Sequence, residues 1–253
     1  MKSFLIAIQF LTIIPVGKKL GISDKGLAKS ASYFPLVGAL IGLLLVAVDF
    51  ILRPLFPDSI VNLFILITLI LVTGALHLDG FMDSIDGLFS GKDKNRILEI
   101  MRDSRTGVFA VVAVICLLLL KLSFLNEIQP DVRYSTLILM PVLSRWAVVY
   151  AIWDYPYARD ISGTGEPFAG LVGVREFINA TVFAAILVIF LMQFKGIIIW
   201  SIAFLFLLLV ARWISKKIGG MTGDTYGAII EILEVVTLVS VYFIYSLKFI
   251  LYG

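Results

Sequence analysis

The chain has 253 residues, of which 60% are hydrophobic and only 15% charged, and its mean hydropathy is +1.02. Soluble domains are nearer to about 45–50% apolar and about 25% charged, so the composition excludes an ordinary water-soluble domain and favours the lipid bilayer as solvent. The net charge of +3 is small and does not by itself indicate a partner, and we expect no nucleic acid among the ligands.

In chain order, the long apolar runs predict a single all-α domain over residues 1–253, a polytopic transmembrane bundle of about seven spans. Each run approaches the ~20 residues that a helix needs to cross the hydrocarbon core. The runs are 33–52, 60–78, 107–125, 134–153, 178–194, 197–214 and 226–251. A shorter apolar run at 4–16 precedes them, and it suits an interfacial or re-entrant segment better than a span or a cleavable signal peptide.

The charges of the loops predict the orientation of the bundle. Thirteen Lys and Arg residues lie in one set of loops and three in the other, the sets being 17–30, 79–106, 154–177 and 215–225 against 53–59, 126–133 and 195–196. Excess Lys and Arg mark the cytoplasmic side. We therefore expect the first set on the cytoplasmic face of the cell membrane.

Three carboxylates follow the second apolar run on this face. On a helix, Asp79, Asp83 and Asp86 fall within an arc of about 60°. They repel one another beside a low-dielectric region, and a bound divalent cation would relieve that cost. Oxygen ligands favour Mg²⁺, Mn²⁺ or Ca²⁺ over zinc. The alternative is a solvated acidic loop in which Asp79 or Asp83 caps a new helix.

A second acidic group opens the last span. Asp224, Glu231 and Glu234 share one helical face, and Gly227 keeps that face open to a ligand or another helix. Glu231 and Glu234 stand in an otherwise apolar run, where ionisable residues are a functional hypothesis by default. We expect these three residues to bind a second metal or the hydroxyl groups of a ligand.

Cations and further polar groups on the same face suit a phosphate-bearing substrate, because guanidinium groups bind phosphate oxygens in pairs. The candidates for substrate binding are Arg102, Arg105, Arg159, Lys216, Lys217 and Thr222. Asp103 is a candidate catalytic residue, metal ligand or orienter of arginines. His77, the one histidine, points away from the acidic stripe and is a candidate general base, metal ligand or structural residue. Arg145, deep in the fourth span, is expected to pair with an acid on a facing helix.

These residues resemble the cobalamin synthase family, and the resemblance runs along nearly the whole chain. The matching elements are Gln9–Thr12 with Pro15, Phe34–Gly38, Gly74–Gly80 with Asp83 and Asp86, Glu99–Gly107, Ser144–Arg145, the loop of Arg159, Gly163, Gly165 and Phe168, and Gly219–Asp224 with Gly227, Glu231 and Glu234. One departure is Ile13, where the family often carries arginine.

The resemblance implies an adenosylcobinamide-GDP ribazoletransferase with Mg²⁺ as its metal. α-Ribazole or its 5′-phosphate would attack the cobinamide-linked phosphate of adenosylcobinamide-GDP, GMP would leave, and adenosylcobalamin or its 5′-phosphate would form. His77, Asp79, Asp83 and Asp103 are then the candidate catalytic residues, and Arg102 and Arg105 would hold the diphosphate. The resemblance also leaves room for a homo-oligomer or for association with other enzymes of the corrinoid pathway.

Two other classes of function remain open at this point. A membrane transferase acting on prenyl diphosphates or CDP-alcohols also uses carboxylate clusters with a divalent metal, although the sequence after Asp79 lacks the CDP-alcohol pattern. A cation-coupled transporter also carries intramembrane acids, but it would place them near the midplane rather than at one face.

Overall fold

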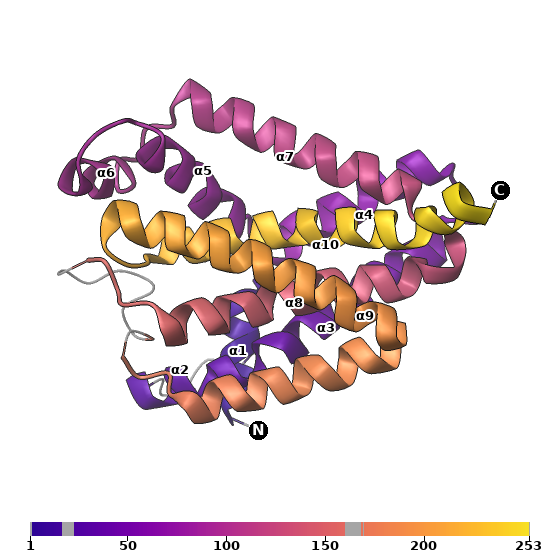
Figure 1. Ribbon diagram of the computed structural model, residues 1–253, viewed down its shortest axis with the longest axis horizontal. Helices are drawn as coiled ribbons and strands as arrows, with labels where there is room; N and C mark the ends of the chain where they lie inside the picture. Colours follow the sequence, from indigo (N-terminus) through magenta and orange to yellow (C-terminus); the bar gives the residue numbers. More distant parts are fainter. Residues whose placement is uncertain (1, 17–22, 160–167, 169, 253) are drawn as a thin grey trace.

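The computed structural model describes residues 2–16, 23–159, 168 and 170–252, and in this part of the chain the regular elements are helices (Figure 1). They are α1 (Lys2–Leu11), α2 (Asp24–Ser30), η1 (Ala31–Tyr33), α3 (Phe34–Leu52), α4 (Asp58–Val72), α5 (Leu76–Leu88), α6 (Lys94–Ile100), α7 (Val108–Glu127), α8 (Pro130–Asp154), α9 (Val174–Ile218) and α10 (Gly223–Tyr252). The predicted all-α class is confirmed.

The described helices support a multi-pass membrane protein but do not confirm the count of seven spans. Five helical segments are long and apolar enough to cross a membrane, and the number rises to six if the bent pair α4 and α5 counts as one span. These segments are Asp24–Leu52, Val108–Glu127, Pro130–Asp154, Val174–Ile218 and Gly223–Ser246. The predicted fifth and sixth spans both fall within the 45 residues of α9.

The helix α9 is not straight. Gln193 has non-helical backbone angles, φ 52° and ψ −136°, and Figure 1 shows the chain of α9 reversing its direction. The reversal is tight, because a Cβ atom built on Gly196 would lie 2.7 Å from the carbonyl oxygen of Val188. Both ends of α9 therefore lie at the same end of the bundle (Figure 1). In the first half of α9, Phe183 stacks on Tyr33 of η1, and near the end of α9 Lys217 donates to the carbonyl of Leu88 in α5.

The predicted second span is broken. α4 ends at Val72 and α5 leaves it at 86°. Gly74 has φ +61°, the N–H of Ala75 donates to Ile70, and that of Gly74 donates to Leu71. This pair of bonds is a Schellman motif, which ends a helix at a residue in the left-handed region. The apolar run 60–78 continues through the break because hydropathy does not register a change of direction.

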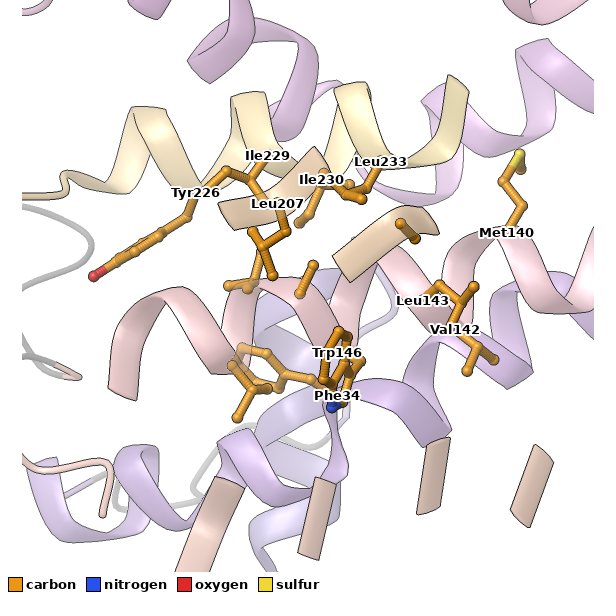
Figure 2. Packing of buried hydrophobic residues seen from close by; sticks show 14 of the residues in the cluster. Phe34, Met140, Val142, Leu143, Trp146, Leu207, Tyr226, Ile229, Ile230 and Leu233 are labelled. Atoms are coloured by element: carbon orange, nitrogen blue, oxygen red, sulfur yellow. The ribbon is translucent and has the colours of Figure 1, made fainter. Parts of the chain in front are cut away.

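α8 is the centre of the bundle, and 89% of its most apolar stretch is buried. α3 approaches it through Gly38 and Gly42, one helical turn apart, in the small-residue spacing that lets membrane helices pack closely. A Cβ atom on Gly42 would lie 2.5 Å from the Cα of Ile138. Figure 2 shows part of the surrounding core, with residues of α3, α8, α9 and α10 that belong to one buried cluster.

Gly42→Ala is expected to lower the stability of the protein by about 1–3 kcal/mol, because the added methyl group meets backbone atoms that cannot move aside cheaply. Thermal unfolding of the detergent-solubilised protein measures this effect. Gly26→Ala is the matched control, since its Cβ would meet only side-chain atoms, the nearest 3.3 Å away. Equal unfolding midpoints for the two variants would show that the α3–α8 contact is not tight.

Candidate active site

The candidate site forms where α5 crosses the start of α10. The crossing is close because both helices carry glycine there: a Cβ on Gly80 would lie 2.8 Å from the carbonyl oxygen of Asp224, and one on Gly227 would lie 3.0 Å from that of His77. Gly227 thus opens its face to another helix, one of the two roles that the sequence predicted. The crossing brings the acidic face of α5 next to Asp224.

Four carboxylates lie near this crossing, three from α5 and one from α10. The Asp83 carboxylate interacts electrostatically with Asp79, Asp224 and Asp86, and with the guanidinium of Arg159. Asp79 and Asp83 form no hydrogen bond or ion pair within the described part of the chain, and Asp79 is exposed. As far as the described residues go, α5 therefore presents two carboxylates whose oxygens can bind a ligand.

Asp86 has a different role, because its carboxylate caps α7. It accepts hydrogen bonds from the backbone N–H of Gly107 at 2.6 Å and of Ala110 at 3.2 Å. These N–H groups belong to the first turn of α7, where helical partners are missing and a negative charge is favourable. Asp86 thus joins α5 to α7 instead of extending the free acidic stripe.

Arg159 and Asp224 form the charged pair at the mouth of the site. Arg159 Nη2 lies 2.5 Å from Asp224 Oδ2, and Arg159 Nε is buried without a hydrogen-bond partner among the described residues. Two backbone bonds hold the arginine there, from Ala158 N to Met221 O and from Met221 N to Pro156 O, both 2.8 Å. The loop after α8 is thereby fixed to the start of α10.

Thr222 has a structural role at this start. Its N–H donates to Thr225 Oγ1 at 2.8 Å and the N–H of Thr225 donates to Thr222 Oγ1 at 3.2 Å, so the two residues cap α10 reciprocally. Thr222 is fully buried. Its hydroxyl also donates to Asp224 Oδ2 at 3.4 Å and so orients that carboxylate.

Two pockets adjoin the Arg159–Asp224 pair. One, of about 290 Å³, is mainly apolar and is lined by Gln9, Phe10, Leu11, Leu76, His77, Asp79, Gly80, Val148, Ile152, Phe168, Gly223, Asp224, Tyr226, Gly227 and Ile230. The other, of about 240 Å³, is basic and is lined by Lys94, Asn95, Leu98, Glu99, Arg102, Ala158 and Arg159. Asp224 belongs to the first pocket and Arg159 to the second, so their ion pair stands between the two.

Glu231 and Glu234 lie deeper in the bundle, in a network of ion pairs. Lys121 Nζ lies 2.5 Å from an oxygen of each glutamate, and Arg145 binds the other oxygen of Glu234. Lys121 is 2% exposed and Arg145 is fully buried. Two positive and two negative charges thus cancel in a region where unpaired charge is costly. The pairing expected for Arg145 is confirmed.

This network changes the interpretation of the second acidic group. Glu231 lies about 10 Å further along α10 than Asp224, because they are seven residues apart and a helix rises about 1.5 Å per residue. Its carboxylate and that of Glu234 are occupied by cations of α7 and α8, so the structure does not support their predicted role as metal ligands. Within the described residues, no three His, Cys, Asp or Glu side chains lie together closely enough to hold a metal ion.

His77 is held at the edge of the same network. It is 4% exposed, and its Nδ1 lies 3.4 Å from Arg145 Nη2. It also lines the apolar pocket. The structural alternative for His77 is therefore supported, and a catalytic role stays a prediction.

The loop cations are divided between the site and its surroundings. Arg102 lines the basic pocket, whereas Arg105 is 85% exposed and bound to Asp103, with 2.6 Å between Nη2 and Oδ2. This pairing lowers the pKa of Asp103 to about 2, so its carboxylate is ionised at any physiological pH. Lys217 donates to the last turn of α5 at Leu88, and Lys216 is exposed. The Gly163 and Gly165 of the predicted loop lie outside the described residues.

The sequence did not assign several residues to the site, although Phe10 and Phe168 stand among the elements that match the family. Phe10, Phe168 and Tyr226 give the apolar pocket its aromatic wall, and Lys94 belongs to the basic pocket. Lys121 was also missed, although a lysine inside the apolar run 107–125 is itself a signal for a buried acidic partner. The aromatic residues carry no such signal in a chain with 13% aromatic content.

The fold and the site define a multi-pass helical membrane protein with free carboxylates, a buried guanidinium and two adjoining pockets at one end of its bundle. The family model described as cobalamin-5-phosphate synthase, CobS, matches residues 3–242, and the chain belongs to this family. No solved structure matches the chain significantly.

Relatives agree with this assignment. A protein of Caldanaerobacter subterraneus subsp. tengcongensis is 38% identical over 240 residues, which cover 94% of this chain and 97% of the relative. One from Desulforamulus reducens is 40% identical over 232 residues, 92% of each chain, and one from Clostridioides difficile is 35% identical over 261 residues, 98% of this chain and 100% of the relative. All three are named adenosylcobinamide-GDP ribazoletransferase, which is a transferase.

Lys121→Met is expected to destabilise the protein by about 3–5 kcal/mol, because it leaves two glutamates buried with one cation. Lys121→Met combined with Glu231→Gln restores neutrality and should recover more than half of the lost stability. Thermal unfolding in detergent measures both, with the exposed Lys25→Met as control. A single variant as stable as the wild type would mean that the four charges do not act as a network.

Proposed function

We propose that the protein joins α-ribazole or α-ribazole 5′-phosphate to adenosylcobinamide-GDP and releases GMP. Membership of the family and the names of the relatives support this reaction. The observation that carries it is the pair of adjoining pockets, one apolar and one basic, separated by Arg159 and Asp224. A displacement at phosphorus needs an acceptor on one side of the phosphate and a leaving group on the other, and two adjoining pockets suit that requirement.

The two pockets suit different substrates. The basic pocket, with Lys94, Arg102 and Arg159, suits the guanosine diphosphate portion, because lysine and arginine bind phosphate oxygens. The apolar pocket, with Phe10, Phe168 and Tyr226, suits the aromatic base of ribazole, since aromatic side chains favour flat rings. The cobinamide-linked phosphate would then lie at Arg159, whose Nε–H has no partner among the described residues.

Magnesium fits the carboxylates of α5. Mg²⁺ is usually held by one or two carboxylates together with substrate phosphates and water. Asp79 and Asp83 are two carboxylates with no other partner in the described part of the chain, and we propose that they hold the ion beside the diphosphate. When bound there, Mg²⁺ would neutralise charge on the phosphate oxygens and on the departing GMP.

The chain's own residues position the reactants. Arg159 binds the phosphate under attack and is itself fixed by Asp224 and by the bonds of its loop to Met221. Asp79 lines the apolar pocket and is exposed, so it is better placed than the buried His77 to take the proton of the attacking ribose hydroxyl. The new bond joins that hydroxyl oxygen to phosphorus, and the bond to the GMP oxygen breaks.

We also propose the finer topology that the sequence predicts. If α9 crosses the membrane twice through its reversal at Gln193, and α4 with α5 count as one broken span, the chain has seven crossings. The excess of Lys and Arg in the loops supports a site on the cytoplasmic face of the cell membrane. An amphiphilic corrinoid can rest at that interface while its diphosphate enters the site.

Turnover by the purified protein in lipid tests the reaction. Adenosylcobinamide-GDP and α-ribazole, supplied with Mg²⁺, should give GMP and the corrinoid product in equal amounts. Asp83→Asn should raise the Mg²⁺ concentration for half-maximal rate by about tenfold or more, because even outer-shell partners of metal ligands typically contribute that much. Asp86→Asn is the matched control and should leave it unchanged, since Asp86 caps α7.

Equal Mg²⁺ requirements for Asp83→Asn and the wild type would overturn the metal assignment while leaving the reaction intact. No product with either form of ribazole, from folded protein, would overturn the reaction itself.

If each pocket binds a different substrate, a substitution in one pocket should raise the KM of one substrate only. Arg102→Gln should raise the KM for adenosylcobinamide-GDP about tenfold or more, as a charge-assisted hydrogen bond to phosphate is lost. Phe168→Leu should raise the KM for ribazole by about three- to tenfold, as an aromatic contact is lost. Arg105→Gln, outside both pocket linings, should change either constant by less than about twofold. If Arg102→Gln and Phe168→Leu raised the same constant, both substrates would share one pocket.

A further inference from the structure

A third pocket lies away from the candidate active site, between the N-terminal helices and the first turns of α9. Its volume is about 180 Å³, and it shares no lining residue with the apolar or the basic pocket. Figure 1 shows α2 beside the beginning of α9 at this end of the bundle. The lining is almost wholly polar: Ser3, Lys29, Ser32, Tyr33, Arg175, Glu176 and Asn179.

Most of these side chains have no hydrogen-bond or ion-pair partner in the part of the chain that the structure describes. Lys29 and Arg175 form no ion pair there, and the Ser32 hydroxyl, on a residue only 5% exposed, forms no hydrogen bond. Glu176 is the exception, because its Oε2 accepts from the N–H of Gly173 at 3.0 Å. The Ser32 hydroxyl lines the pocket and can donate a hydrogen bond to a ligand there.

The charges of the lining favour an anion. Lys29 and Arg175 carry two positive charges against one negative charge on Glu176, which leaves a net charge of +1. Hydroxyl groups of Ser3, Ser32 and Tyr33 and the amide of Asn179 can add neutral donors. This is the donor set that binds the singly charged oxygens of a phosphodiester.

The surface next to the pocket is apolar. Val174, Ile178, Val182 and Ile186, each four residues from the next, are exposed by 49–60% and form one stripe along the first half of α9. Arg175 and Asn179 adjoin this stripe in the sequence at its polar end. A polar cation pocket that ends an exposed apolar stripe matches the shape of a phospholipid, with its headgroup at the interface and its acyl chains along the helix.

We propose that this pocket binds the phosphodiester headgroup of an anionic phospholipid, whose acyl chains lie along the stripe from Val174 to Ile186. The lipid would connect α9 to α2 and η1 through Arg175, Lys29 and Ser32. Its binding is independent of the proposed transferase reaction, since no residue of the pocket belongs to that site.

Native mass spectrometry of the detergent-solubilised full chain tests the proposal, with phosphatidylglycerol, phosphatidylcholine and glycerol phosphate added separately. Phosphatidylglycerol should bind, and phosphatidylcholine should bind at least about tenfold more weakly, since its headgroup carries a compensating cation. Lys29→Gln and Arg175→Gln should each weaken phosphatidylglycerol binding about tenfold, because a charge-assisted bond is lost. Lys29 and Arg175 are both exposed, and unchanged thermal unfolding in phosphatidylcholine would verify that the two variants fold.

Lys25→Gln is the matched control, because Lys25 lies one turn before Lys29 on the same helix and does not line the pocket. If Lys25→Gln weakened binding as much as Lys29→Gln, only diffuse attraction to basic residues would be present and the proposal would fail. It would also fail if glycerol phosphate bound as well as phosphatidylglycerol, since the ligand would then be a soluble phosphate compound. The proposal is supported if glycerol phosphate does not bind and if phosphatidylglycerol binds the Lys25→Gln variant as tightly as the wild type.

Discussion

A charge in a membrane interior must be cancelled where it stands, and the four buried charges of Lys121, Arg145, Glu231 and Glu234 meet this requirement by binding one another. These charges come from α7, α8 and α10, helices that also contact their neighbours through many apolar side chains. In lipid such contacts have no hydrophobic driving force, so ion pairs and close packing determine which helices associate. The network therefore fixes α7, α8 and α10 to one another, and its contact with His77 includes α5. These charges lie deeper in the bundle than the α5–α10 crossing, and they hold in place the helices that form the site.

The opposite end of the bundle uses the same device. Arg133 of α8 binds Asp49 of α3, and it also donates to Asn62 of α4, whose amide donates to Asn126 of α7 at 2.7 Å. Asp49 and Asn62 are fully buried. Two polar clusters thus hold the helices at different depths, and the segment between them depends on glycine contacts such as those of Gly38 and Gly42. Neither cluster presents a free carboxylate, which separates them from Asp79 and Asp83.

The sequence predicted the membrane class, the helical fold and the neighbourhood of the site, because apolar runs and one-sided clusters of charge depend on composition over many residues. It did not predict which acids are free. Asp86 and Asp83 are the same residue type on the same helix, yet Asp86 caps α7 through contacts with residues 21 and 24 positions away. The break at Gly74 was missed for a related reason, because it is a local change of backbone angle inside an apolar run. The reversal of α9 at Gln193, in contrast, lies two residues from the turn predicted at 195–196. A single sequence does not show which distant residues a side chain contacts, and hydropathy does not show a turn within an apolar run.

The distinction between occupied and free acids explains how one short helix can serve both structure and chemistry. α5 carries Asp86 at its far end, where it caps α7. Nearer the bend, Asp79 lines the apolar pocket and Asp83 interacts electrostatically with Arg159. The 86° bend directs this helix away from the line of α4, so a segment that hydropathy assigns to a single span can end in a polar site. Irregular backbone within a membrane protein is tolerated where protein or a water-filled cavity satisfies it. The N–H of Ile13 does so here, donating to the carbonyl of Val72 at 2.8 Å. The N-terminal segment is thus bound to the break, and through Gln9 and Phe10 to the apolar pocket, which gives this short helix a place in the site without any requirement that it cross the bilayer.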